Sequence, residues 1–167
     1  MSRDQDLRRD RLIFYENDVY RLEGELDTFL ELSGARCALL IDKDGHLVTR
    51  RGEPVGTSIE SIAALIAGSF AATKEMARLL GESEFTIMFH QGARDSIQLQ
   101  LIGDRTLLAV LFDERTNMGL VRFYAQETCQ HIETVLAEIA ARPPSAQQAT
   151  LSKDFSADAA AALDNLF

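Results

Sequence analysis

An uncharged helical stretch in the middle of the chain constrains the fold most. Thr57 and Glu60 have the spacing of a capping box, and Gly81 can adopt the left-handed conformation that ends a helix. No charged residue occurs from Ser61 to Thr73, although a surface helix normally carries charges opposite its core-facing side. The run is shorter than the roughly 20 apolar residues that cross a bilayer. We therefore expect a globular domain in which both sides of this helix are covered.

When the residues of this stretch are placed about 100° apart around a helix axis, they fall on two unlike sides of the helix. The bulky side is expected to pack on a sheet and consists of Ile59, Ile62, Leu65, Ile66, Phe70, Met76, Ala77 and Leu80. The other side, here called the small-residue strip, consists of Ala64, Ala67, Gly68, Ala71, Ala72, Glu75 and Arg78. The strip is either buried inside its own domain or a docking surface for a second copy or a partner. Charges at its ends resemble the polar rim of an interface and favour docking.

The remaining pattern predicts an α+β fold. A stripe through Tyr15, Val19, Leu22, Leu26 and Phe29 indicates a first helix that ends at Gly34. Short apolar or alternating runs predict strands over 36–42, 46–50, 85–90, 96–101 and 106–112. The last of these is apolar enough to be central and covered on both faces.

A final helix over 117–142 ends at Pro143. Its expected inner stripe is Val121, Ala125, Thr128, Cys129, Ile132, Val135, Leu136 and Ile139. The predicted order is helix, strand, strand, helix, strand, strand, strand, helix. The simplest arrangement is a five-stranded antiparallel sheet with helices on its faces.

This organisation gives a domain over residues 12–142, a linker over 143–152 and a tail over 153–167. The tail is acidic but carries apolar residues, and its proposed partner-binding motif is Phe155, Leu163, Asp164, Asn165, Leu166 and Phe167. A helix this short is marginal in isolation. The tail therefore either folds on a partner, docks on its own domain or stays unstructured.

Composition excludes several classes of function. The formal net charge is −9 and no basic stripe occurs, which argues against binding to nucleic acid or to an anionic membrane surface. Cys37 and Cys129 match no metal or redox spacing and are expected to be reduced core residues. The polar N-terminus has no signal-peptide core, so the expected compartment is the cytoplasm.

No residue pattern indicates an active site, a cofactor or a metal. His46, His90 and His131 are scattered, and the sequence has neither a phosphate-binding loop nor a nucleophile elbow. The start of a calcium loop at Asp42-Lys-Asp-Gly45 lacks the later ligands. Arg94, Arg115 and Arg50-Arg51 lie where they could reach a partner's active site. We expect a protein that is not itself an enzyme.

Several stretches in sequence order resemble the Roadblock/dynein light chain family, and more closely its bacterial MglB-like branch. They are Leu39-Leu-Ile-Asp-Lys-Asp-Gly45, Ala67-Gly68, Gly81-Glu-x-Glu-Phe85, Phe89-His-x-Gly-Ala-Arg-Asp-Ser96, Leu111-Phe-Asp-x-Arg-Thr-x-x-Gly-Leu-Val-Arg122 and Asp164-Asn-Leu-Phe167. Lys74 and Glu75 depart from the branch, because small residues are expected there.

The resemblance implies a homodimer that binds a Ras-like small GTPase of the MglA type, accelerates its GTP hydrolysis and helps to set bacterial cell polarity. It implies two copies per GTPase, central helices as the docking platform, a catalytic arginine supplied by the GTPase itself and a tail motif that docks elsewhere on the GTPase. Two alternatives stay open. They are a scaffold that tethers partners without stimulating them and a module that senses a small molecule.

Overall fold

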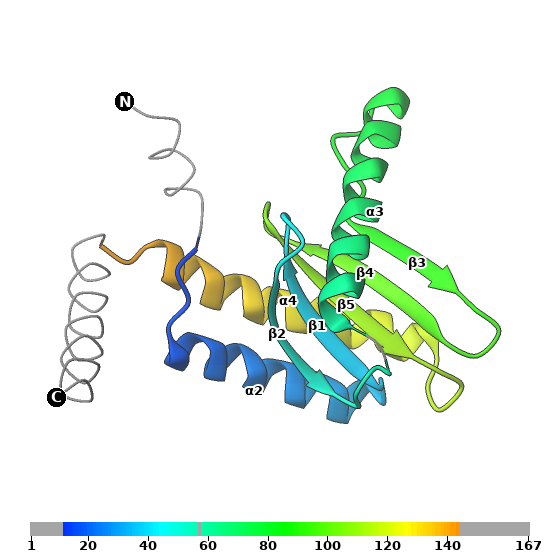
Figure 1. The fold of residues 1–167 in the computed structure, drawn as a ribbon, viewed down its shortest axis with the longest axis horizontal. Helices are drawn as coiled ribbons and strands as arrows, with labels where there is room; N and C mark the ends of the chain where they lie inside the picture. Colours follow the sequence, from blue (N-terminus) through cyan, green and yellow to red (C-terminus); the bar gives the residue numbers. More distant parts are fainter. Residues whose placement is uncertain (1–11, 57, 144–167) are drawn as a thin grey trace, which may run out of the picture. The chain divides into compact units, whose positions relative to one another are not determined.

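The computed structural model describes residues 12–56 and 58–143 and has the predicted α+β architecture (Figure 1). In chain order the elements are α2 (Glu16–Ser33), β1 (Cys37–Asp42), β2 (Leu47–Gly52), α3 (Ile59–Leu80), β3 (Ile87–Gln91), β4 (Ser96–Ile102), β5 (Thr106–Phe112) and α4 (Met118–Ala140). None of the described helices is long and apolar enough to cross a bilayer.

The five strands form one antiparallel sheet in the order β2-β1-β5-β4-β3. Ala109 of β5 lies between Leu39 of β1 and Leu99 of β4, so β5 is the central strand, as its apolar sequence predicts. The β3–β4–β5 meander places β3 at one edge of the sheet and β2 at the other.

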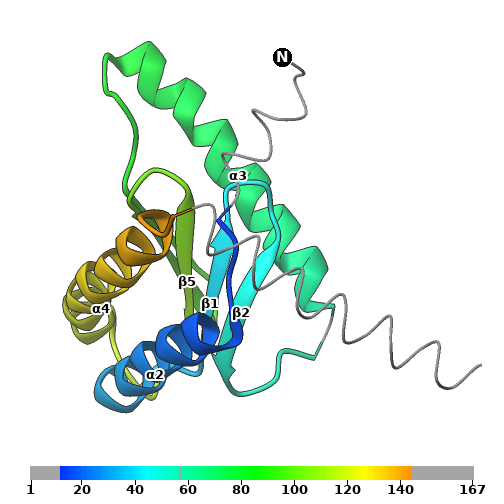
Figure 2. The ribbon, with the colours of Figure 1, turned by 90° about the vertical axis from the view of Figure 1, so that its left-hand side faces the viewer.

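The period-two pattern of the strands divides the core between two faces of the sheet (Figure 2). Leu39 and Ala109 point to the face covered by α3, where they pack with Ala63, Ile66 and Phe70. The opposite face is covered by α2 and by the part of α4 up to Val135. Every member of the stripe predicted for α4 is buried, which confirms that stripe.

The chain divides into two compact units. One is 16–135, and the described residues of the other are 12–15 and 136–143. Within the second unit the Arg142 guanidinium lies 5.0 Å from the centre of the Tyr15 ring.

The two ends of α3 test the predicted helix boundaries. The N-cap is Ser58, whose hydroxyl accepts a hydrogen bond from the backbone N–H of Ser61, so the predicted cap at Thr57 was one residue too early. Thr57 itself lies outside the described residues. At the other end Gly81 has φ 81° and donates to the Arg78 carbonyl, while Glu82 donates to the Ala77 carbonyl. This pair of bonds is a Schellman motif and confirms Gly81 as the stop.

The predicted bulky side of α3 is partly wrong. Leu65, Met76 and Leu80 are 73%, 52% and 73% exposed. Ile66, Phe70 and Ala77 are buried as predicted, whereas the buried Ala63, Ala67 and Thr73 are not expected on this side. Small residues thus occupy part of the buried face. Leu79 and Leu80 belong to the last turn of α3, which projects past the sheet (Figure 1).

Candidate docking surface on α3

The outer side of α3 carries most of the small-residue strip. Ala64, Gly68, Ala71 and Ala72 are exposed. A Cβ atom added to Gly68 would meet no other heavy atom within 4 Å, so this glycine is not required by close packing inside the described fold. The result is a flat, uncharged ridge that another protein backbone could approach closely.

Part of the strip has a structural role instead. Ala67 is only 7% exposed, contrary to its expected position on the outer side. Gly45 in the β1–β2 turn has φ 90°, and a Cβ there would lie 3.2 Å from Ala64 Cα and 3.5 Å from Ala67 Cβ. The turn packs against the helix, and this contact explains why positions 64 and 67 are small.

The charged end of the strip is internally paired. Arg78 Nε donates to the Glu75 carboxylate at 3.1 Å, one helical turn away. This hydrogen bond lowers the pKa of Glu75 and raises that of Arg78. Both side chains are well exposed, so the pair presents a polar border to the ridge and adds little stability.

An apolar groove runs along one flank of α3, toward the β3 edge of the sheet. Here called the edge groove, it has a volume of about 340 Å³. Its lining consists of Ile62, Leu65, Ile66, Ser69, His90, Ile97, Leu99 and Leu111. The sequence pattern placed Leu65 against the sheet, whereas it forms an exposed wall of this groove. Helical periodicity does not show that the sheet is wider than the single helix covering this face.

A smaller hollow lies on the other flank of α3, beside the β1–β2 and β4–β5 turns. This turn-side pocket has a volume of about 160 Å³. Its lining consists of Lys43, Asp44, Ala67, Phe70, Ala71, Lys74, Leu101, Asp104, Arg105 and Leu107. Apolar side chains form its floor and charged groups its rim. The sequence did not predict it, because the two turns are far apart along the chain.

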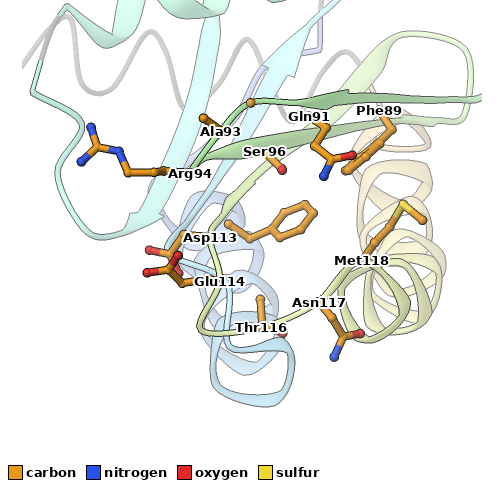
Figure 3. Close-up of a pocket in the computed structure, with 12 residues that line it drawn as sticks. Phe89, Gln91, Ala93, Arg94, Ser96, Asp113, Glu114, Thr116, Asn117 and Met118 are labelled. Carbon is orange, nitrogen blue, oxygen red and sulfur yellow. The ribbon is translucent and has the colours of Figure 1, made fainter.

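Figure 3 shows a third hollow, between the β3–β4 turn and the loop from β5 to α4. Phe89 and Met118 line one end, and Phe89 stacks on Phe112 with ring centres 5.9 Å apart. Arg94 extends away from the hollow (Figure 3) and forms no ion pair within residues 12–56 and 58–143. No cysteine, histidine or lysine lines this hollow.

Arg115 is held in an ion-pair network and is not free to reach into the active site of a partner. Its guanidinium lies 2.8 Å from Glu53 and 3.0 Å from Asp113. Arg36 lies 3.0 Å from the same Glu53 and 2.7 Å from Asp95. A hydrogen bond donated by Arg115, followed in importance by one from Arg36, lowers the pKa of Glu53 to about 2. The network connects the start of β1, the β2–α3 loop, the β3–β4 turn and the loop that leads into α4.

Arg50 and Arg51 differ in their surroundings. Arg51, near the end of β2, donates to both Asp27 carboxylate oxygens of α2 at 2.8 Å. The hydrogen bond from Arg51 to Asp27 raises the pKa of Arg51. Arg50 is half-buried. The strand end is thus tied to α2. Among these four arginines, Arg94 is the one that is exposed and forms no ion pair within the described residues.

One cluster of possible metal ligands and two cysteines have structural surroundings that the fold accounts for. Asp42, Asp44 and His46 bring three ligand atoms within 4.8 Å of one another. One Asp42 oxygen already accepts hydrogen bonds from the backbone N–H groups of Asp44 and His46, both at 2.9 Å, and so shapes the turn. Cys37 and Cys129 are buried thiols, as expected, and burial raises the pKa of Cys129 to about 12.

Comparison with known proteins agrees with this architecture. The family model for the Roadblock/LC7 domain matches residues 23–112. A gliding protein MglB from Thermus thermophilus is 32% identical, with a TM-score of 0.72, over 76% of this chain and 96% of that chain. MglB from Myxococcus xanthus is 32% identical, with a TM-score of 0.73, over 80% of this chain and 99% of that chain.

A third structure, described as MglB with a tetrameric arrangement, is 30% identical, with a TM-score of 0.73, over 77% of this chain and 96% of that chain. No curated protein matches the chain. The family model covers more than half of the sequence, and the chain therefore belongs to the Roadblock/LC7 family.

Proposed function

We propose that this protein is a regulator of a Ras-like small GTPase of the MglA type and acts by docking that GTPase on α3. The observation that carries the proposal is the exposed ridge around Gly68, on a chain that is at least 30% identical to MglB proteins. An uncharged ridge without bulky side chains lets a second surface lie close to the helix backbone.

In this proposal the protein acts as a homodimer, and two surfaces of α3 have different partners. These surfaces are the edge groove and the small-residue strip. The edge groove is apolar, Leu65 stands exposed beside it, and β3 is an edge strand with one unpaired side. Both features favour a second copy of the chain at this flank. The small-residue strip then stays available for the GTPase.

Acceleration of hydrolysis would come from stabilising one arrangement of the GTPase switch loops. The gain cannot exceed the difference in affinity for the two arrangements. A hundredfold acceleration requires about 2.7 kcal/mol of transition-state stabilisation, which a few well-packed side chains can supply. A lent arginine typically gives about 10³- to 10⁵-fold. The network that holds Arg115 supports the first mechanism.

The tail motif from Phe155 to Phe167 lies outside the described residues and completes the proposal as a second contact with the GTPase. Placement of the protein at a cell pole is part of the same proposal. Imaging of a fluorescent fusion tests it.

The decisive experiment mixes the protein with a GTP-loaded MglA-type GTPase from the same organism and measures both affinity and turnover. Gly68→Arg is expected to abolish binding without lowering the melting temperature, because the added side chain enters open space and arginine favours a helix over glycine. The matched control is Gly24→Arg, because Gly24 is an exposed glycine of α2 that also has open space at its Cβ position. Binding without faster turnover would identify a scaffold instead, and lost binding together with a lower melting temperature would assign Gly68 to the core.

A further inference from the structure

We propose that the turn-side pocket receives one large apolar side chain of the GTPase, and that its cationic rim pairs with a carboxylate beside that side chain. The pocket would therefore help to select the partner. The inference rests on the proposed function and adds a second contact to the small-residue strip.

The size and floor of the pocket fit one side chain. Phe70 and Leu107 are buried beneath it, Leu101 is half-buried, and Ala67 and Ala71 form a low wall. At about 30 Å³ per water, 160 Å³ corresponds to about five water molecules. That space suits a leucine, methionine or phenylalanine side chain and is below the roughly 300 Å³ of typical small-ligand sites. Large apolar anchors that enter such pockets contribute much of the energy at many interfaces.

The rim carries more positive than negative groups, although the chain has a formal net charge of −9. Lys43, Lys74 and Arg105 are the cations, and Asp44 and Asp104 are the acids. Arg105 lies 3.5 Å from Asp104. Lys74 is 4.0 Å from Glu84, and Lys43 forms no ion pair in the described part of the chain. The Lys43 ammonium group can therefore bind a partner carboxylate at the pocket mouth, and Lys74 can do so in place of its long contact with Glu84.

Position connects the pocket to the strip. Ala71 lines the pocket and is also an exposed member of the strip, so a protein lying on the outer side of α3 would cover the pocket mouth. Lys74, which departs from the small residue expected in the MglB-like branch, lies on the rim. In this proposal, the lysine at position 74 serves to select the partner of this chain.

The test uses the full chain and the GTP-loaded MglA-type GTPase of the same organism, with affinity measured by calorimetry at several salt concentrations. Lys43→Glu and Lys74→Glu should each weaken binding about tenfold and reduce its salt dependence. The control is Arg122→Glu, an identical charge change at an exposed position of α4, on the other face of the sheet (Figure 2). It should change affinity by less than about twofold at physiological salt.

A second pair of variants tests the pocket volume. Ala71→Phe places an aromatic ring at the exposed edge of the pocket and should weaken binding, whereas Ala71→Ser keeps the pocket open and should bind as the wild type does. A melting curve for each variant verifies that it folds. Lys43 is an exposed turn residue with no ion pair to lose in residues 12–56 and 58–143, so its substitution should leave the melting temperature unchanged.

The outcomes separate the two proposals. If Gly68→Arg abolishes binding while the Lys43→Glu and Lys74→Glu variants bind as the wild type does, the pocket inference is wrong and the docking ridge remains. If the wild type does not bind the GTPase, both are wrong. Equal weakening by Arg122→Glu would show a long-range charge effect and would also overturn the role of the pocket.

Discussion

At the scale of single residues, three glycines show that one residue type serves different purposes. Gly45 allows the β1–β2 turn to pack on Ala64 and Ala67, whereas Gly68 faces open space and Gly24 has no neighbour near its Cβ position. The sequence already separates Gly45, between two predicted strands, from Gly68, in the middle of a predicted helix. The distances add that Gly45 lies against α3 and that Gly68 is not required by packing within the described fold.

Gly45→Ala is expected to destabilise the fold by about 1–3 kcal/mol, the usual cost of a left-handed conformation in a residue other than glycine. The close approach to the Ala64 backbone at 3.2 Å adds to this cost. Chemical denaturation measures the free energy of unfolding. Gly24→Ala in α2 is the control and should stabilise the protein slightly, since alanine favours a helix. An unchanged unfolding free energy for Gly45→Ala would show that the turn does not need its glycine.

Glu53 gives the fold a pH dependence with a defined sign. Its pKa in the folded protein is about 2, below its ordinary value of 4.5, because Arg115 and Arg36 donate hydrogen bonds to the carboxylate. The folded state therefore favours the charged form. This stabilisation is fully present above pH 4.5 and is lost as the pH falls toward 2. Glu53→Gln should flatten the unfolding free energy over that interval, and an equally steep profile in the variant would assign the dependence to other carboxylates.

At the scale of elements, the sequence predicts the type and order of all eight helices and strands of the described chain. Short apolar or alternating runs identify the strands, and Gly81 and the stripe of α4 are predicted correctly because each depends on local pattern. The orientation of α3 on the sheet is not predicted correctly. Leu65 and Met76 are predicted on the same side of the helix as the buried Phe70, and their exposure depends on how much of the sheet one helix covers. The pockets depend on contacts between distant segments, which a single sequence does not contain.

The edge groove makes a prediction for α3 as an element. Leu65→Glu should disrupt self-association, because it places a charge in an apolar wall that a second copy is proposed to cover. Sedimentation velocity measures the oligomeric state. Leu120→Glu is the matched control, since Leu120 is also an exposed leucine but belongs to α4 on the other face of the sheet. Dissociation by both variants, or by neither, would contradict a dimer built on this flank.

At the scale of the whole molecule, the described ranges contain surfaces suited to contact rather than a catalytic cluster. The ridge, the edge groove and the turn-side pocket all border α3, so one helix would contact two partners at once, a second copy and the GTPase. An ion-pair network holds the β2–α3 loop that leads into this helix. Arg94, exposed in the β3–β4 turn, is the residue whose behaviour distinguishes a lent catalytic group from a docking platform.

Arg94→Ala is therefore expected to leave the stimulated turnover of the GTPase within about threefold of the wild type, since a lent arginine would instead cost about 10³-fold or more. Single-turnover hydrolysis at saturating regulator separates this effect from affinity. Arg94→Lys is a useful companion, because lysine keeps the charge but cannot reproduce the two-pronged contact of a guanidinium. A collapse of turnover in both variants with unchanged binding would mean that this chain completes the active site of its partner. Retained turnover, combined with lost turnover in Gly68→Arg, would instead place the whole effect in the docked surface of α3.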